Sequence, residues 1–145
     1  MRRVNLHRVE LDDVSARDGY RWRRVRVGRA IGGEQIGASL FELGDGERTF
    51  PYHFHHGTEE WLLVVGGTPT LRSPEGERVL IEGDVVCFPA GEAGAHAVTG
   101  PGSVLILSAA ASPDISEYPD SGKVGVRPQG ANYRIRDGVD YWYGE

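Results

Sequence analysis

Short apolar segments separated by turn residues dominate the sequence and restrict its possible folds more than any other feature. Seven segments are predicted strands: residues 35–43, 60–65, 68–72, 78–81, 84–88, 95–98 and 103–109. Turns rich in glycine and proline lie between them, as at residues 44–46, 73–76 and 100–102. No long segment keeps the 3.6-residue period of a helix. This pattern predicts an all-β domain, either a sandwich or a barrel.

Length and composition indicate one compact domain. The chain has 145 residues, of which 39% are hydrophobic and 26% charged, enough for one hydrophobic core and too few for two ordinary domains. The longest apolar run, residues 61–65, is too short to cross a bilayer, and the arginine-rich start lacks the apolar core of a secretory signal. The single cysteine, Cys87, lies in an apolar run, which predicts a buried, reduced thiol. We therefore expect a cytoplasmic protein without a membrane partner.

Charge divides the chain into a basic amino-terminal stretch and an acidic body. Residues 1–29 hold nine arginines against four acids, whereas the remaining residues hold seven basic and seventeen acidic side chains. The acidic body argues against nucleic acid as a partner, because phosphate binding needs a positive surface. No helix-turn-helix, zinc finger or aromatic RNA platform accompanies the basic segment 20–29. We expect this segment to pair with the acidic body or with a partner subunit.

Four of the five histidines, His53, His55, His56 and His96, lie near the predicted strands. His53 and His55 are two residues apart, so their side chains share one face of an extended chain, and Glu60 begins the next predicted strand. Two imidazoles and a carboxylate are suitable ligands for a first-row divalent cation. A His-x-His pair alone is usually a surface pair, but the glutamate at this distance in a β-rich chain favours a metal site.

These residues give the chain a resemblance to the cupin superfamily. The first cupin motif is G-x5-H-x-H-x3,4-E-x6-G, and the residues that fit it are His53, His55, Glu60 and Gly67. The glycine before them, Gly46, stands one residue too far upstream. The second motif is G-x5-P-x-G-x2-H-x3-N, and its first half is matched by Gly83, Pro89 and Gly91. His96 then follows two residues later than the motif requires, and Gly100 replaces the final asparagine. The resemblance covers roughly residues 35–110.

The resemblance implies a cupin jelly-roll barrel that forms a single domain over residues 1–145. Its parts would be an amino-terminal arm (1–30), a barrel core (about 31–111) and a carboxyl-terminal extension (112–145). It also implies one divalent transition metal, Fe, Mn, Ni, Co or Zn, held by His53, His55, Glu60 and His96. The glycine-rich segment 91–95 can absorb the two extra residues before His96. His56 is predicted to lie in a turn, outside the ligand set.

A six-coordinate metal with four protein ligands keeps positions open for water, dioxygen or a substrate oxygen. We therefore expect a small-molecule metalloenzyme of the dioxygenase, isomerase, decarboxylase or lyase type, without a further cofactor. The alternative is a non-catalytic cupin that binds or senses a small molecule. A purely structural metal is less favoured, because structural zinc sites are rich in thiolate ligands. The catalytic acid or base is unknown from sequence, and the fold alone does not select a reaction.

Alternation along residues 60–65 predicts which side chains line the barrel and which face outward. Leu62 and Val64 share the inward side with Glu60, and together with Phe41 they predict a mainly apolar cavity. The outward side chains are Trp61, Leu63 and Val65. Because such an apolar face needs cover, we expect a homodimer, or else cover from residues 1–30 or 112–145. The aromatic tail at residues 141–143 is predicted to fold back on the barrel or onto another subunit.

Overall fold

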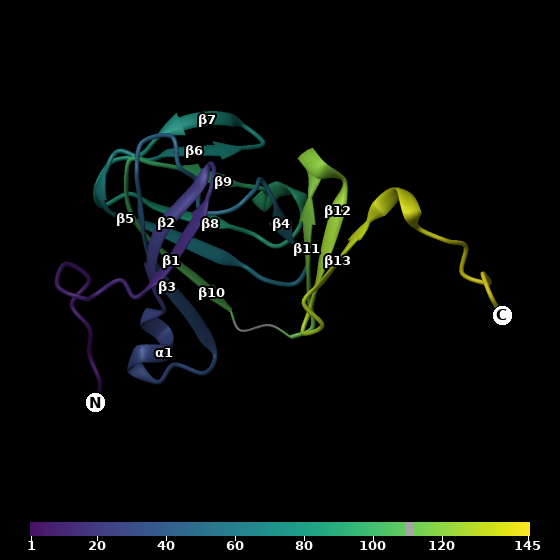
Figure 1. The fold of residues 1–145 in the computed structure, drawn as a ribbon, viewed down its shortest axis with the longest axis horizontal. Helices are drawn as coiled ribbons and strands as arrows, with labels where there is room; N and C mark the ends of the chain where they lie inside the picture. Colours follow the sequence, from purple (N-terminus) through teal and green to yellow (C-terminus); the bar gives the residue numbers. More distant parts are fainter. Residues whose placement is uncertain (110–111) are drawn as a thin grey trace.

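The structure is a computed structural model that describes residues 1–109 and 112–145. Its largest sheet has six antiparallel strands in the spatial order β1 (Asp13–Arg17), β2 (Tyr20–Val25), β3 (Ile36–Leu43), β10 (Gly102–Ala109), β5 (Glu60–Gly67) and β8 (Val85–Phe88). A three-stranded sheet contains β7 (Gly76–Val79), β6 (Thr70–Ser73) and β9 (Ala97–Thr99). A four-stranded sheet contains β13 (Ala131–Arg134), β12 (Lys123–Arg127), β11 (Asp114–Tyr118) and β4 (Phe54–His55). The predicted all-β fold class is confirmed (Figure 1).

The helices in the described residues are short. They are α1 (Val27–Ile31) and the 3-10 turns η1 (Glu92–Gly94), η2 (Pro119–Ser121) and η3 (Ile135–Asp137). None of these helices combines the length and apolar character that a membrane crossing requires. The predicted end of the barrel core, residue 111, lies outside the described residues, so the domain boundaries stay predictions.

The seven predicted strands correspond to β3 and to β5 through β10, with differences at their ends. The largest difference is at β7, which begins at Gly76 rather than at residue 78, because Ser73 of β6 pairs with Gly76 across a tight turn. Strands β1 and β2 were not predicted, because charged residues alternate through this part of the chain. Strands β11, β12 and β13 of the extension were also missed. Residues of these three strands line the cavity at the candidate site.

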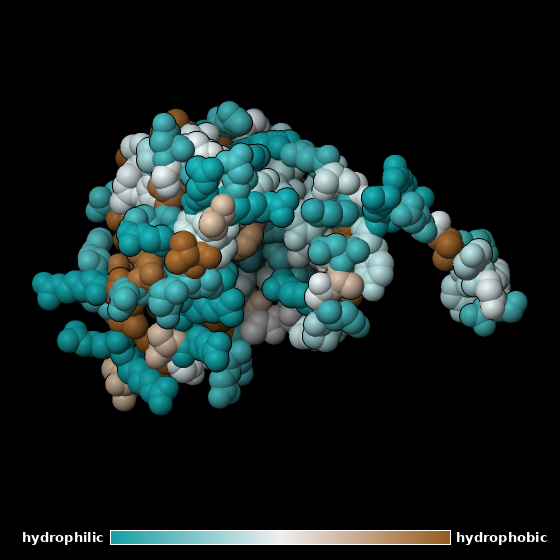
Figure 2. All heavy atoms as spheres, viewed as in Figure 1, coloured by the Kyte–Doolittle hydropathy of each residue, from teal (hydrophilic) through white to brown (hydrophobic). Residues whose placement is uncertain are grey.

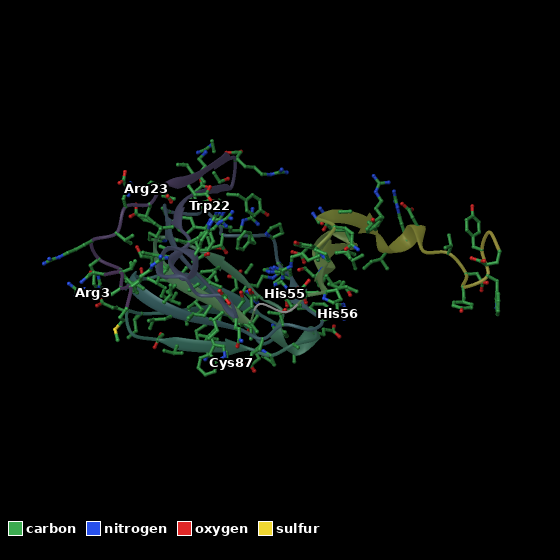
Figure 3. The ribbon with its side chains drawn as sticks, turned by 90° about the horizontal axis from the view of Figure 1, so that it is seen from below. Arg3, Trp22, Arg23, His55, His56 and Cys87 are labelled. Atoms are coloured by element: carbon green, nitrogen blue, oxygen red, sulfur yellow. The ribbon has the colours of Figure 1, made fainter. Side chains whose placement is uncertain are left out.

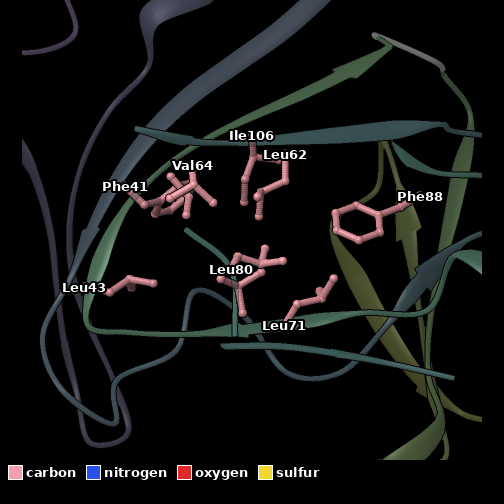
Figure 4. Close-up of a cluster of buried hydrophobic side chains, with 10 residues drawn as sticks. Phe41, Leu43, Leu62, Val64, Leu71, Leu80, Phe88 and Ile106 are labelled. Atoms are coloured by element: carbon pink, nitrogen blue, oxygen red, sulfur yellow. The ribbon is translucent and has the colours of Figure 1, made fainter. Parts of the chain in front are cut away.

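The main core lies between the six-stranded and three-stranded sheets (Figure 4). Its buried members are Phe41, Leu43, Leu62, Val64, Leu71, Leu80, Phe88, Val98, Val104 and Ile106. The inward orientation predicted for Leu62 and Val64 is confirmed, since both are almost fully buried. Burial of a side chain of this size contributes about 1.5–3 kcal/mol. This core fixes β5 and β10, which carry one wall of the candidate site.

The amino-terminal arm covers part of the outer face of the six-stranded sheet. Val25, Val27 and Leu40 are buried in a second cluster, and the partly buried side chains around them are Val4, Leu6, Val9, Leu11, Ala38, Val65 and Leu105. The basic segment also pairs with the acidic body, as predicted, through Arg23–Glu42 and Arg21–Glu47 ion pairs. The arm therefore adds both apolar cover and charge pairing to the barrel.

The outer face keeps exposed apolar side chains beyond the reach of the arm. Trp61 is 46% exposed, and Val85 and Ile36 are also exposed. Cys87 is exposed as well, so the prediction of a buried thiol is wrong. The reason is strand alternation: Cys87 pairs with Trp61 between β8 and β5, while its neighbours Val86 and Phe88 contact the core.

The end of the carboxyl-terminal extension projects away from the barrel (Figures 1 and 2). Tyr141, Trp142 and Tyr143 are 84%, 71% and 74% exposed. The prediction that this tail folds back on its own barrel is therefore wrong. Contact with another subunit stays a prediction.

Candidate metal centre

The four histidine and glutamate residues singled out by the motif come from three separate segments of the fold. His55 belongs to β4, Glu60 begins β5, and His53 and His96 lie just before β4 and β9. The backbones of His53 and His96 form an antiparallel bridge, with N–H···O distances of 3.1 and 2.8 Å. This bridge brings the two imidazole rings to a centroid distance of 4.8 Å. His55 lies where the barrel meets the sheet of the extension (Figure 3).

The two extra residues before His96 are taken up by the 3-10 turn η1. Gly94 ends this turn against the backbone of Pro89, and a Cβ at Gly94 would lie 1.9 Å from the Pro89 carbonyl oxygen. Only glycine fits such a close approach. The Phe88 ring stacks on His96, with a centroid distance of 3.8 Å and an interplanar angle of 7°. The shifted spacing therefore does not remove His96 from the site.

Nitrogen and oxygen donors converge around the Glu60 carboxylate. Its Oε2 atom lies 3.5 Å from His55 Nε2 and 3.4 Å from His96 Nε2. Donor atoms of His53, Glu60 and His96 all lie within 4.8 Å of one another, close enough to hold a metal ion. The side chains of His55, His96 and Glu60 are 8%, 4% and 12% exposed. The group is thus nearly enclosed.

The other ring nitrogen of each histidine is held by an oxygen acceptor. His53 Nδ1 donates to the Pro51 carbonyl and His96 Nδ1 to the Gly94 carbonyl, both at 2.9 Å. His55 Nδ1 donates to the Asp114 carboxylate at 2.6 Å. Because these acceptors fix the proton on Nδ1, each Nε2 presents a lone pair to the centre. Metal-binding histidines are normally oriented by such hydrogen bonds.

The charge states of this group also suit metal binding. Burial, together with the neighbouring His96 and His55, lowers the pKa of His53 to about 4. Burial alone would raise the pKa of Glu60, but the close contact with His96 and the neighbouring His55 and His53 imidazoles outweighs it and lowers that pKa. At neutral pH His53 is therefore uncharged and Glu60 ionised, which are the forms that bind metals.

Asp114 and Arg127, from the extension, complete the surroundings of His55. The Asp114 side chain is fully buried and accepts hydrogen bonds from Arg127 at 2.6 Å and from the Gly57 backbone at 3.3 Å. Burial would raise the Asp114 pKa, but bonds to Arg127 and His55 hold it at about 2. Asp114 and Arg127 lie beyond the cupin motifs, which end near residue 100, so the motifs did not predict this pair. The alternation of polar and apolar residues in β11 was the available signal.

The cavity at this centre has a volume of about 410 Å³. Its polar lining includes Arg24, Arg127, Ser39, Ser108, Ser116, Asn132 and Tyr118. Phe41 lines the cavity as predicted, but Leu62 and Val64 belong to the closed core, so polar side chains make up a larger share of the lining than the sequence suggested. The inward residues of β3 and β10 become small and polar towards the extension, and β11 to β13 contribute further polar groups.

Two neighbouring residues, His56 and Tyr52, lie outside the centre. His56 is half exposed and contacts the Glu117 carboxylate at 3.0 Å. Tyr52 points away from the metal centre. The Arg72 guanidinium lies over the Tyr52 ring, 3.9 Å from the ring centroid. Neither residue lines the cavity at the four-residue group.

Comparison with known proteins gives the family. The family described as Cupin domain matches residues 39–109. A protein of Acidithiobacillus ferrooxidans, provisionally described as a sugar phosphate isomerase, is similar with 26% identity and a TM-score of 0.77, over 84% of this chain and 81% of that one. A sugar phosphate isomerase of the cupin superfamily from Silicibacter pomeroyi is 23% identical over 96% of both chains, with a TM-score of 0.82. The polyketide cyclase RemF of Streptomyces resistomycificus is 21% identical over 79% of this chain and 83% of that one, with a TM-score of 0.60.

No curated protein matches the chain. The matched segment, residues 39–109, contains β3 through β10, which form the barrel and carry His53, His55, Glu60 and His96. The similar structures extend the likeness of fold to nearly the whole length. Residues 39–109 form a cupin domain, and the chain as a whole has the fold of the similar cupin structure.

Proposed function

We propose that this cupin is a metal-dependent enzyme that isomerises a small, polar, oxygen-rich molecule. One divalent metal would be held by His53, His55, Glu60 and His96. When bound, the metal would act as a Lewis acid towards a substrate oxygen. The rest of the cavity would bind and orient that substrate through side chains of this chain.

The orientation of the three imidazoles carries the metal part of the proposal. Each Nδ1–H already donates to a carbonyl or carboxylate oxygen, so three Nε2 lone pairs and the Glu60 carboxylate face one another. Without a cation between them, these electron-rich atoms repel one another. A divalent cation would satisfy all of them, and nitrogen and oxygen donors of this kind suit Fe, Mn, Ni, Co and Zn.

The cavity lining supports a polar substrate. Serine hydroxyls from β3, β10 and β11, together with Asn132, offer hydrogen bonds to substrate hydroxyl groups. Arg127 donates to Asp114 and also lines the cavity, where it suits an anionic substrate group. The similar protein of Acidithiobacillus ferrooxidans is provisionally described as a sugar phosphate isomerase, which fits this chemistry. For these reasons we favour isomerisation over oxygenation of an apolar compound.

The test is an isomerisation assay with metal-loaded protein and a panel of aldose and ketose phosphates, followed by proton NMR. We expect wild type and His56→Ala to interconvert at least one pair, and Glu60→Ala to show only background conversion. Full metal occupancy without conversion of any pair would contradict the isomerase proposal. Conversion that survives equally in Glu60→Ala would contradict the role of the metal.

A second candidate function is binding without catalysis. The described residues that line the cavity include no imidazole or carboxylate beyond the four proposed ligands, so no separate general base is at hand. The remaining titratable hydroxyl is that of Tyr118, whose pKa is raised chiefly by burial. Saturable binding of a panel compound by calorimetry, without turnover, would favour this second function.

We also propose that the chain forms a homodimer through the outer face of the six-stranded sheet. Trp61, Val85 and Ile36 are exposed on this face next to the part that the arm covers. Exposed apolar groups of this kind mark interaction surfaces. Light scattering coupled to size-exclusion chromatography should give a dimer for wild type and a monomer for Trp61→Glu. A monomeric wild type would contradict the proposal.

A further inference from the structure

A second cavity, separate from the metal centre, lies between the β1–β2 hairpin and the three-stranded sheet. Its volume is about 670 Å³, within the usual range for sites of small ligands. It shares only Phe50 with the lining of the first cavity. None of the four proposed metal ligands lines it. Its chemistry can therefore be considered independently of the proposed function.

Aromatic rings form much of the wall of this second cavity. Tyr20 and Trp22 come from β2, and Tyr52 comes from the loop before β4. The Arg48 guanidinium lies 4.7 Å from the Tyr20 ring centre, and that of Arg72 lies 3.9 Å from the Tyr52 ring centre. Such cation–π contacts hold the rings in place. Trp22 is visible beside the hairpin, well apart from His55 (Figure 3). The cavity thus offers rigid, flat surfaces to a ligand.

The charge of the lining is positive, although the whole chain carries −5. Four cationic side chains line the cavity, Arg17, Arg48, Arg72 and Lys123, against the two carboxylates of Glu77 and Asp120. Arg72 already binds Asp120 through two hydrogen bonds of 2.6 and 2.9 Å. The other three cations form no ion pair within 4.0 Å among the described residues. A concave, positive surface attracts and concentrates small anions.

We propose that this second cavity binds a small organic anion that carries a flat ring, of the class of nucleoside monophosphates. The ring would lie against the Tyr20, Trp22 and Tyr52 walls, and the anionic group would be held by Arg48 and Lys123. Base-type rings gain stability by stacking on aromatic side chains. Both halves of such a ligand thus have matching groups in one cavity.

The same cavity touches the surroundings of the metal centre at two points. Lys123 Nζ lies 4.8 Å from the Tyr118 ring centre, and Tyr118 stacks on His53 with an interplanar angle of 19°. Phe50 lines both cavities and packs edge-on against His53. A ligand in the second cavity would therefore contact Phe50, which packs directly against a proposed metal ligand, and Lys123, which contacts the tyrosine stacked on that ligand.

The test uses adenosine 5′-monophosphate as the probe and metal-free, full-length protein, so its result does not depend on the metal proposal. Proton–nitrogen NMR follows the three tryptophan indoles during the titration. We expect the Trp22 signal to shift with saturation, while those of Trp61 and Trp142, which lie outside this cavity, stay in place. Inorganic phosphate, which has no ring, should bind at least about tenfold more weakly.

Two double variants are compared, and each removes two positive charges. The test variant is Arg48→Gln/Lys123→Gln, inside the cavity, and the control variant is Arg8→Gln/Arg78→Gln, outside it. We expect the first pair to weaken binding at least about tenfold and the second pair to leave it unchanged. The aromatic walls are tested by Tyr52→Leu, with folding checked by circular dichroism, and this variant should also bind more weakly. No saturable Trp22 shift, equal affinity for phosphate, or equal losses in both charge pairs would overturn the proposal.

Discussion

The amino-terminal arm and the carboxyl-terminal extension both lie largely outside the matched cupin segment, yet they contribute different things. The arm places apolar side chains such as Leu6 and Leu11 on the outer face of the main sheet. The extension adds strands β11 to β13 beside β4 and brings Asp114 and Arg127 to His55. The arm therefore stabilises the barrel and adds one polar side chain, Arg24, to the cavity, whereas the extension adds four, Ser116, Tyr118, Arg127 and Asn132. The comparison shows that the surroundings of the candidate site depend on residues beyond the cupin motifs.

Removing apolar groups from the arm should have the largest effect on stability. In Leu6→Ala/Leu11→Ala two half-buried side chains are truncated, and we expect the free energy of unfolding to fall by roughly 2–3 kcal/mol. Urea denaturation measures this loss. Metal stoichiometry should not change, because neither leucine lines the cavity at the proposed metal site. The control is Val14→Ala, at a valine of the same arm that is 66% exposed, which should shift stability by less than about 0.5 kcal/mol.

A change in the extension should affect the site instead. Asp114→Ala leaves His55 Nδ1 without its carboxylate acceptor, so we expect metal affinity to fall about 10–100-fold. Competition with a coloured chelator measures the affinity. The control is Glu117→Ala, which removes the similar carboxylate partner of the exposed His56 and should leave affinity unchanged. Equal losses in both variants would remove the distinction between the two histidines.

The low pKa of Asp114 predicts that the stability of the folded protein depends on pH. The Asp114 pKa is about 2 in the folded protein, below its usual value of 3.8. Its stabilising contribution is therefore complete above pH 3.8 and is lost as the pH falls towards about 2. We expect metal-free wild type to lose stability over this interval more steeply than Asp114→Asn. Parallel pH profiles of the two proteins, from thermal unfolding, would show that Asp114 has no such role.

The smallest effect is expected at the end of the extension. Residues 139–145 lie away from the barrel, and the side chains of Tyr141, Trp142 and Tyr143 are mostly exposed. Deleting these residues should change the free energy of unfolding by no more than about 0.5 kcal/mol in dilute, monomeric protein. A larger loss would mean that the tail packs on the barrel in solution.

Local spacing predicted much of the candidate site. The distance from His53 and His55 to Glu60 is short in sequence, and alternation along β5 placed Leu62 and Val64 correctly. Gly91 and Gly94 made room for the shifted His96, as the composition of that segment suggested. Features that depend on one strand and its adjacent turn are therefore readable from sequence.

Features that depend on distant pairing were not predicted. Asp114 is 59 residues from His55, and Arg127 is 72 residues from it, so no local pattern joins them. The cavity was predicted to be mainly apolar because Ser116, Tyr118, Arg127 and Asn132, which form much of its polar wall, belong to the extension. The exposure of Cys87 was missed for another reason: all residues around it in β8 are apolar, so the inward side of the strand was not evident from polarity.

The most direct test of the central proposal is the metal content of tag-free protein purified without chelator. Elemental analysis of wild type, His53→Ala and His56→Ala under identical conditions compares a proposed ligand with its exposed neighbour. The account predicts close to one Fe, Mn, Ni, Co or Zn per chain in wild type and in His56→Ala, and almost none in His53→Ala. Absence of metal from wild type even after reconstitution, or equal metal loss in both variants, would contradict it.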